Sequence, residues 1–463
     1  MEIPENWVVL KLGEIAEINP RKRTDEISDE TLVSFIPMKA VEETTGKFDA
    51  TDIRHLKDVK KGYTSFFEGD MIFAKITPCM ENGKIAVAHN LKNGLGFGST
   101  EFHVVRFQAD ILKQYAFYYV IQKRFRDKAR LSMTGSAGQL RVPKSFLEEV
   151  EIPLPPLPEQ HRIVAKLEEL FSELDNGIAN LKKAQAQLKV YRQAVLKAAF
   201  EGKLTEQWRA ASSEATPDAA DKLLEQIKVE RQRHSKKPKE YPPLTEAELK
   251  ELPALPVGWK WVVPELIADP SKHSLTIGPF GSDLKVSDYE KSGVPLIFVR
   301  HITSNNFDLN PQFISEIKFQ ELIAHAVEPD DLLITKMGDP PGDCTIYPKG
   351  RPTGIITADC LKFRVWGKYF SKMFYYHCIN STHVKKQLGL ITKGVAQKKI
   401  SLARFKSILL PLPSPAEQHQ IVQEIESRLS VCDHLEQEIG KALQQSEALR
   451  QSILKKAFEG RLI

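Results

Sequence analysis

The stretch LPEQHRIVAKLEELFSELDNGIANLKKAQAQLKVYRQAVLKAAFEGKLT, residues 157–205, decides the fold because the chain repeats it at its end. Residues 415–463 read PAEQHQIVQEIESRLSVCDHLEQEIGKALQQSEALRQSILKKAFEGRLI. An offset of 258 residues aligns His161 with His419 and Phe200 with Phe458, and no gap is needed. A repeat with so long a period indicates that a whole domain was duplicated together with its helix.

Apolar residues in both copies alternate at spacings of four and three, which predicts one long helix per copy with a coiled-coil seam. The seam is more regular in the first copy than in the second, and its residues are Leu167, Phe171, Leu174, Ile178, Leu181, Leu188 and Val195, then Ile425, Leu429, Ile439, Leu443 and Ile453. Ser414, Pro415 and Glu417 predict a capping box at the start of the second helix. Gly202 and Gly460 stand where helices commonly end.

A single heptad helix would indicate dimerisation between chains about as well as pairing within one chain. Two copies favour an internal antiparallel pair, because a tandem repeat that closes about a two-fold axis sets its second helix against its first. Each helix, roughly 60 Å long at 1.5 Å per residue, would then act as a ruler between two domains.

The segments before the helices contain short apolar runs separated by glycine and polar turns, which predicts a mixed α/β fold class with a pseudo-two-fold internal repeat. PENW (4–7) returns as PVGW (256–259), and TGSAGQLRV (134–142) returns as TKGVAQKKI (392–400). The two segments share the order of these motifs while the residues between and within them differ, which favours two domains with two versions of the same function.

Five segments follow from these patterns. They are a first domain at 1–156, a first long helix at 157–205, a charged linker with a short helix at 206–255, a second domain at 256–413 and a second long helix at 414–463. The amphipathic run at 218–235 within the linker is predicted to be a solvated helix.

Composition limits the class of protein. The chain has 463 residues, a formal net charge of +5 and 42% hydrophobic residues, which is ordinary for globular domains and permits a nucleic-acid partner without arguing for one. The five cysteines form no C-x-x-C pair, which disfavours a disulfide framework and a zinc site. No stretch approaches the roughly 18 apolar residues that a membrane helix needs. We therefore expect a cytoplasmic protein without membrane contact.

Motifs of enzymatic chemistry are missing from the sequence. It contains no phosphate-binding G-x-x-x-x-G-K-[ST], no H-E-x-x-H and no G-x-S-x-G. DPPG at 339–342 resembles the D-P-P-aromatic motif of amino-methyltransferases, but Gly342 removes the ring that stacks on a flipped base, so a turn is the better interpretation. We expect no catalytic residue, no metal ligand and no cofactor in this chain.

Polar and basic positions on or beside predicted strands and loops are candidates for DNA contact. Lys and Arg neutralise phosphate or bond to guanine, while Asn and Gln match adenine. The candidates are Lys39, Lys75, Asn82, Lys84, Gln139 and Arg141 in the first domain, and Ser282, Lys285, Arg300, His301, Lys336, Gln397, Lys398 and Lys399 in the second. Singly, each is equally explained as an ordinary surface residue, and only the paired sets make them candidates.

The order domain, helix, domain, helix resembles the specificity subunit of Type I restriction-modification enzymes. The resemblance rests on LPPLPEQ before the first helix and on the endings RQAVLKAAFEGKLTEQWR and RQSILKKAFEGRL, with GPFGSDLKVSDY (278–289) and TPCMENGKIA (77–86) similar to segments of target-recognition domains. It implies two target-recognition domains of mixed α/β fold, held apart by two long antiparallel coiled-coil helices. Each domain would read one half of a split, asymmetric target in double-stranded DNA.

The same resemblance implies a subunit without a catalytic site of its own. Two modification subunits, which carry S-adenosylmethionine and methylate adenine, would dock on the duplicated helices. Two restriction subunits would add ATP-driven translocation and cleavage, so ATP and magnesium are also expected on the partners and not on this chain.

Two alternatives remain open from the sequence. One is a coiled-coil adaptor whose domains bind proteins, which would form complexes without sequence-specific DNA binding. The other is an enzyme acting alone, which the missing motifs disfavour and which methyl transfer by the purified chain would revive.

Overall fold

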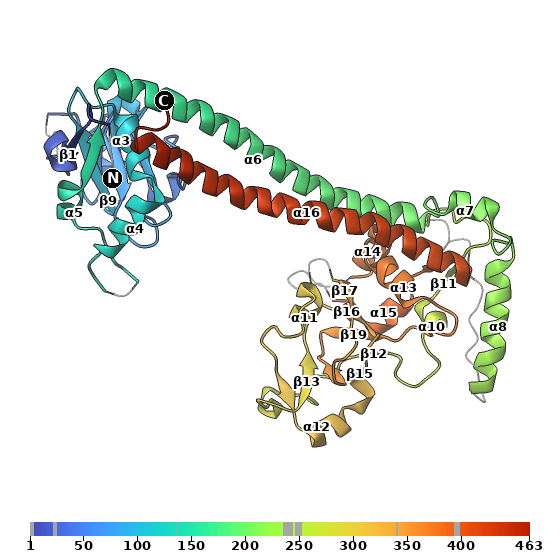
Figure 1. Cartoon of the computed structure of the whole chain (residues 1–463). Coiled ribbons are helices and arrows are strands. Elements are labelled where there is room, and N and C mark those ends of the chain that lie inside the picture. Colours follow the sequence, from blue (N-terminus) through green and yellow to red (C-terminus); the bar gives the residue numbers. More distant parts are fainter. Residues whose placement is uncertain are drawn as a thin grey trace. The chain divides into compact units, whose positions relative to one another are not determined.

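The computed structural model describes residues 4–21, 26–136, 138–234, 244–245, 252–338, 341–392 and 399–463. The chain divides into two compact units (Figure 1). The first unit contains residues 1–183 and 438–463, and the second contains residues 184–437. Each long helix therefore begins in one unit and ends in the other.

The first unit builds its strands from short, fully apolar runs separated by turns. Its elements are β1 (Val8–Lys11), α1 (Leu12–Ile15), β2 (Ala16–Ile18), β3 (Leu32–Ile36), β4 (Ile53–His55), α2 (Leu56–Val59), β5 (Thr64–Phe67), β6 (Met71–Ala74), β7 (Ile85–Val87), β8 (Leu95–Gly98), β9 (Phe102–Phe107), α3 (Lys113–Val120), α4 (Lys123–Leu131), α5 (Lys144–Glu149) and β10 (Glu151–Leu154). Two short 3-10 turns, η1 (Met38–Ala40) and η2 (Lys92–Gly94), join them.

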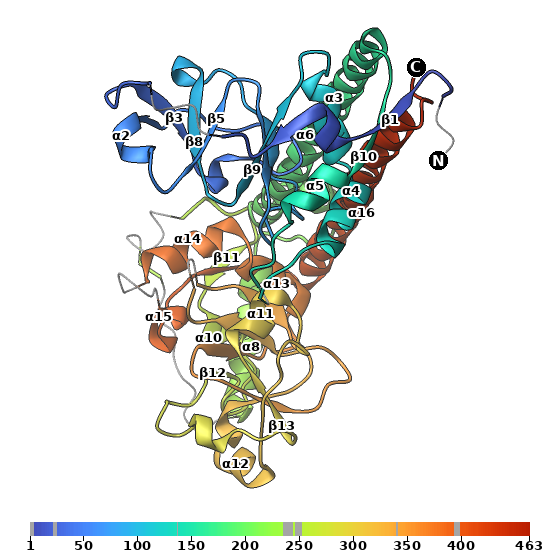
Figure 2. The same cartoon turned by 90° about the vertical axis from the view of Figure 1, so that its left-hand side faces the viewer.

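The strands of the first unit form three sheets, with the orders β4-β3-β8-β5, β2-β9-β6-β7 and β1-β10. Figure 2 shows β3, β8 and β5 side by side beyond α2. Strand β3 runs parallel to β8, and the other pairs are antiparallel. All four residues of β6 are buried, as expected for a central strand covered on both faces.

The second unit repeats this plan. Its elements are α7 (Glu206–Ala211), α8 (Ala219–His234), β11 (Lys260–Val262), α10 (Pro264–Ile267), β12 (Leu275–Ile277), η3 (Val286–Asp288), β13 (Val294–Ile297), α11 (Val299–Ser304), β14 (Phe313–Ile314), α12 (Glu316–Glu321), η4 (Ile323–His325), β15 (Ala326–Val327), β16 (Leu332–Thr335), β17 (Cys344–Ile346), β18 (Gly354–Ile356), β19 (Cys360–Phe363), α13 (Lys372–Ile379), α14 (Thr382–Leu390), α15 (Leu402–Lys406) and β20 (Leu410–Leu412). The sheet orders are β14-β13-β18-β15, β12-β19-β16-β17 and β11-β20. Among the strands described in this unit, only β13 and β18 pair in parallel, as β3 and β8 do in the first. The predicted mixed α/β fold with an internal repeat is confirmed.

The two long helices are α6 (Leu157–Phe200) and α16 (Pro415–Phe458), of 44 residues each. In the first unit Arg450 pairs with Asp175, and in the second Arg192 lies 2.7 Å from Asp433. From the first pair to the second, the residue on α6 moves 17 positions towards the C-terminus, from Asp175 to Arg192, and the residue on α16 moves 17 positions towards the N-terminus, from Arg450 to Asp433. The helices are therefore antiparallel, as predicted. The seam residues predicted above are all buried or half-buried.

Both helices end at the predicted glycines, where the backbone takes the left-handed conformation. The φ angle is +72° at Gly202 and +68° at Gly460. A Cβ at Gly202 would lie 2.2 Å from Pro256, and one at Gly460 would lie 2.2 Å from Pro4. Glycine is thus required twice over, by the angle and by the proline of the P-x-x-W segment against it.

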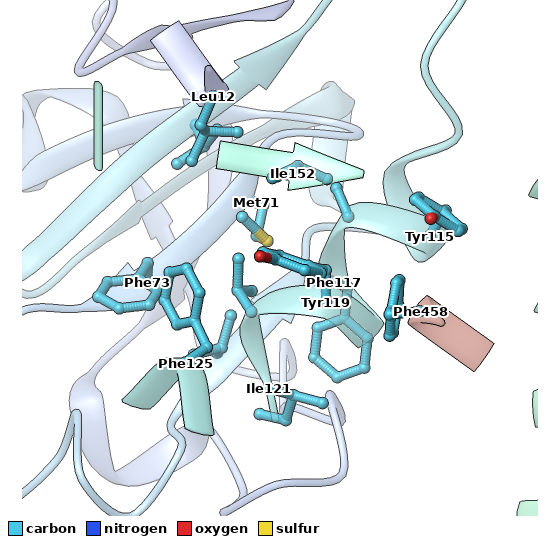
Figure 3. Packing of buried hydrophobic residues seen from close by; sticks show 14 of the residues in the cluster. Leu12, Met71, Phe73, Tyr115, Phe117, Tyr119, Ile121, Phe125, Ile152 and Phe458 are labelled. Carbon is cyan, nitrogen blue, oxygen red and sulfur yellow. The ribbon is translucent and has the colours of Figure 1, made fainter. Parts of the chain in front are cut away.

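The far end of a long helix completes the core of each unit. In the first unit the Phe458 ring of α16 lies 5.0 Å from Tyr115 and 5.2 Å from Tyr119, both on α3 (Figure 3). In the second unit Phe200 of α6 lies 5.3 Å from Phe374 of α13. These aromatic pairs bury large areas, so Phe200 and Phe458 of the repeated AFEG endings are core residues that also stand at helix ends.

Two local predictions are wrong. The expected capping box is only half formed, because the Ser414 hydroxyl caps the Glu417 amide at 3.2 Å while the Glu417 side chain turns away to Trp259. The helix expected to be solvated, α8, buries Ala220, Leu223 and Ile227 against the core of the second unit. Its charged composition reflects only the other face of the helix.

Candidate nucleic-acid interface

A tryptophan at the start of each unit is tied to the start of a long helix. The indole of Trp7 donates to Glu159 at 3.1 Å, and that of Trp259 donates to Glu417 at 2.8 Å. The following glutamine is used equally in both copies, since the Gln160 side chain accepts from the Leu112 amide at 3.0 Å and donates to the Pro155 carbonyl at 2.9 Å. Gln418 makes the same two contacts, with Ser371 and Pro413.

A largely buried ion pair holds the turn before each central strand. Arg106 binds Asp70 through two hydrogen bonds of 2.8 and 2.7 Å, and Arg364 binds Asp331 at 2.7 and 2.9 Å. In each case the hydrogen bonds to the carboxylate raise the pKa of the arginine. In both units the aspartate carboxylate also accepts a hydrogen bond from the backbone amide of the residue three positions before it. These pairs fix the strands β6 and β16 that carry the candidate lysines at their ends.

Lys75 and Lys336 occupy equivalent positions, directly after β6 and β16. The Lys75 amide donates to the Glu101 carbonyl at 2.9 Å and its carbonyl accepts from Val142 at 2.8 Å. Lys336 makes the same backbone contacts with Asp359 at 2.7 Å and Ile400 at 2.9 Å. Its Nζ donates to the Ala358 carbonyl at 2.9 Å, so its side chain is partly engaged.

Lys75, Gln139 and Arg141 are brought together around Glu101. Arg141 binds the Glu101 carboxylate with hydrogen bonds of 2.9 and 2.8 Å, and its Nη1 donates to the Gln139 carbonyl at 3.1 Å. Hydrogen bonding by Arg141, with a smaller contribution from the charge of Lys75, lowers the pKa of Glu101. The Gln139 side chain is exposed. It follows Thr134 and precedes Arg141, whose backbones pair with each other in an isolated antiparallel bridge.

Lys39, Asn82 and Lys84 lie around the turn that follows β3. Lys84 Nζ donates to the carbonyls of Met38 at 3.3 Å and Val41 at 2.8 Å, so it holds the turn in place. Asn82 donates to Glu43 at 2.8 Å. Lys39 is exposed on η1. Of these three, Lys39 is the side chain best placed to meet a phosphate.

The candidates of the second unit fall into separate groups. Arg300 donates to the carbonyls of Leu309 at 3.2 Å and Asn310 at 2.6 Å, and its guanidinium lies 4.0 Å from the Phe298 ring centre. His301 is buried, donates to the Leu309 carbonyl at 2.9 Å, and has its pKa lowered mainly by burial. Both residues thus hold the 309–310 loop.

Three of the remaining candidates are exposed. Ser282 and Lys285 are exposed before η3, and Lys399 is exposed where its backbone bridges to Met337. Gln397 and Lys398 lie outside the described residues, as does Asp339 of the DPPG segment.

Several important residues escaped the sequence analysis. The acids Glu101 and Asp331 set the positions of neighbouring cations, but isolated carboxylates carry no signal in a single sequence. Glu417 was predicted only as part of a capping box, and its contact with the Trp259 indole was missed. The tether of tryptophan to glutamate did have a signal, because the P-x-x-W and E-Q pairs are each repeated.

Two further searches cover only the part of the chain that the structure describes. It contains no group of three or more His, Cys, Asp or Glu residues that could hold a metal ion. It also contains no helix with the length and apolar character needed to cross a bilayer.

A family model described as the Type I restriction modification DNA specificity domain matches residues 4–183 and 300–445, and so covers parts of both units. The chain belongs to this family. It is therefore a Type I restriction-modification specificity subunit with two target-recognition domains, and not a catalytic subunit, as the resemblance implied.

Individual relatives agree with this assignment. The chain is 27% identical over 96% of its length to the Type I restriction enzyme EcoEI specificity subunit of Escherichia coli, of which it covers 81%. It is 35% identical over 56% of its length to the EcoAI specificity subunit of Escherichia coli, of which it covers 50%. One solved chain shares the fold, with a TM-score of 0.73, 19% identity and full coverage of both chains. Its structure is described under the words "Structural basis underlying complex assembly and conformational transition of the type I R-M system".

Proposed function

We propose that each target-recognition domain reads one half of a split DNA target and that the two half-sites differ in sequence. The observation that carries this proposal is that the two units share strand order, tether and ion pair while differing in their exposed loops. One scaffold places equivalent loops on DNA, and different side chains on those loops select different bases.

The candidate residues divide by what their side chains already bind. We assign DNA contact first to the exposed or least engaged side chains, namely Lys39, Lys75, Gln139, Ser282, Lys285 and Lys399. Lys84, Arg141, Arg300 and His301 instead hold the loops in position, because their polar atoms are committed to protein partners. Lys336 Nζ has one such partner, the Ala358 carbonyl. Because its side chain is long, we still assign Lys336 to DNA contact.

We further propose that the recognition domains span residues 1–156 and 256–413, with 206–255 as the linker between repeats. The beginnings of α6 at Leu157 and α16 at Pro415 support these limits.

The proposed partners are two modification subunits, which carry S-adenosylmethionine and methylate adenine, and two restriction subunits, which use ATP and magnesium. The duplicated helices offer the modification subunits their docking surface. Large exposed apolar side chains on the helices support this, since such residues are typical of interfaces; they are Val190, Tyr191, Val431, Leu435 and Leu449. We also propose that the complex is cytoplasmic, because its proposed partners act on cellular DNA.

The test is selection on duplex DNA. The chain is purified with the modification subunit encoded beside it and incubated with a randomised duplex library, and the bound DNA is recovered by mobility shift and sequenced. We expect enrichment of one motif with two unlike halves and a fixed unspecified spacer. A stable complex that enriches no motif would favour the adaptor.

A further inference from the structure

The loop GPFGSDL at 278–284, which follows β12 in the second unit (Figure 1), holds a large apolar side chain in solvent. Phe280 is 71% exposed, whereas Gly278 and Pro279 directly before it are buried. At the other end of the loop, Leu284 packs against a cluster of buried apolar residues. The exposed ring therefore stands between two anchored ends.

Backbone contacts fix the course of this loop. The Gly278 amide donates to the Cys360 carbonyl at 3.1 Å, and a Cβ at Gly278 would collide with the Thr357 carbonyl oxygen. Glycine alone permits so close an approach. Beyond the ring, the Asp283 amide donates to the Phe280 carbonyl at 2.9 Å and closes a turn. The backbone of Phe280 is thus held on both sides.

The turn against which the loop rests also holds Lys336. The Lys336 amide donates to the Asp359 carbonyl at 2.7 Å, and its Nζ donates to the Ala358 carbonyl at 2.9 Å. Residues 357–360, between β18 and β19, therefore connect the loop to a lysine that we assign to DNA contact. The exposed ring belongs to the same part of the second unit as this lysine.

The loop itself offers a ring and no cation. Residues 278–284 include no Lys or Arg, and their one acid, Asp283, accepts a hydrogen bond from the exposed Ser282 at 3.0 Å. Contacts with phosphate have to come from neighbours such as the exposed Lys285. Phe280 presents instead an apolar surface whose removal from water is favourable.

We propose that Phe280 inserts its ring between neighbouring bases of the half-site that the second unit reads, an inference that rests on the proposed function. Apolar side chains that enter a base step partly unstack it and bend the duplex. An aromatic ring can stack on any base, because every base has a π-face. Phe280 thus contributes to affinity and to the shape of the DNA, while polar side chains of the unit read the identity of the bases.

The first test measures DNA affinity by fluorescence anisotropy at several salt concentrations, with the chain in complex with the modification subunit and the duplex that this complex selects. Phe280→Ala is expected to bind about tenfold more weakly with an unchanged salt dependence, because stacking releases no counterions. Lys285→Ala is the ionic control and should reduce the salt slope by about one unit. Phe280→Tyr keeps the ring and should restore binding.

Three results of this test overturn the proposal. Equal affinities for wild-type and Phe280→Ala complexes would show that the ring does not contact DNA. Dissociation of the modification subunit from Phe280→Ala, measured by native mass spectrometry, would show that the ring docks on that protein. A lower unfolding temperature of Phe280→Ala would assign the ring to the fold, whereas the exposed position predicts no change.

The second test locates the insertion with 2-aminopurine, a base that fluoresces more strongly when it is unstacked. It is placed in turn at each position of the half-site except the methylated adenine. We expect an increase at one base step in wild-type and Phe280→Tyr complexes and none there in Phe280→Ala. No increase at any position, or an equal increase in Phe280→Ala, overturns the proposal.

Failure of the proposed function would have a different sign. The wild-type complex itself would then enrich no DNA motif. If this inference alone fails, the wild-type complex still selects its motif and Phe280→Ala binds that motif equally well.

Discussion

Replacing the buried carboxylate at the start of α16 by its isosteric amide, Glu417→Gln, should loosen the second unit selectively. Glu417 is 2% exposed and accepts from Trp259, from Thr205 at 2.8 Å and from the guanidinium of Arg209, which is 17% exposed. The substitution keeps the volume but leaves Arg209 without its carboxylate. Breaking one side of a buried ion pair costs about 3 kcal/mol at the lower end of the observed range.

The internal repeat supplies the control, Glu159→Gln. Within the described part of the chain, Glu159 receives only the neutral donors Trp7 at 3.1 Å and Asn6 at 3.0 Å, and its surroundings are more open. Each such bond contributes about 1 kcal/mol, and the amide oxygen of glutamine can still accept one of them, so the cost should stay near 1 kcal/mol.

Hydrogen exchange measures each unit separately, which matters because a two-unit chain has no single unfolding free energy. We expect the amides of β11 and β20 to lose about 3 kcal/mol of protection in Glu417→Gln, and those of β1 and β10 to lose about 1 kcal/mol in Glu159→Gln. Equal losses in the two variants, or a larger loss for Glu159→Gln, would refute the reasoning that the charge of Arg209 makes the difference.

Four other predictions concern DNA contact, core, helix register and pH. Charge reversal at Lys75 or Lys336 should weaken DNA binding and reduce the salt dependence of the binding constant by about one unit of slope, measured by anisotropy, while the modification subunit still binds; loss of assembly would reassign these residues to folding. Phe458→Ala should cost the first unit about 3–5 kcal/mol by opening a cavity, seen by calorimetry as a lower transition for that unit alone. Four residues inserted after Leu181 should rotate the seam and change the target spacer or abolish assembly, and an unchanged spacer would contradict the ruler hypothesis. Burial lowers the pKa of His377 to about 4. The unfolded chain therefore binds a proton at this residue between pH 6.5 and 4 while the folded chain does not, so the free energy of unfolding falls by about 1.4 kcal/mol per pH unit as the pH drops from 6.5 towards 4. In urea titrations His377→Tyr should lack this dependence.

The long helices and the duplication were predictable because each rests on many residues at once. A seam of apolar positions, two glycine ends and an ungapped repeat all indicate the same antiparallel pair, and the structure has it. Period and capping are local signals, so they survive without knowledge of the tertiary fold.

The sheet order was not predictable from one sequence. Strands such as β3 and β8 have five and four residues and pair in parallel across almost sixty intervening residues. Short apolar runs indicate strands without specifying their neighbours, because register depends on packing of the whole sheet. The burial of α8 escaped for a related reason, since three apolar residues on a charged helix are enough to dock it.

The candidate site was predictable in part. Equivalent positions such as Lys75 and Lys336 follow from the repeat, and they do lie in equivalent backbone environments. Whether a cation faces outward or holds a loop depends on partners distant in sequence. Arg141 is 40 residues from Glu101, and His301 meets a carbonyl that its own helix does not supply.

The central claim is that this chain directs a methyltransferase to a split DNA target. The measurement that tests it most directly is a genome-wide map of N6-methyladenine in cells that express the modification subunit with and without this chain. We predict methylation at a single motif with two unlike halves, present only when the chain is expressed. The same methylation in its absence, or none in its presence despite a stable complex, would contradict the claim.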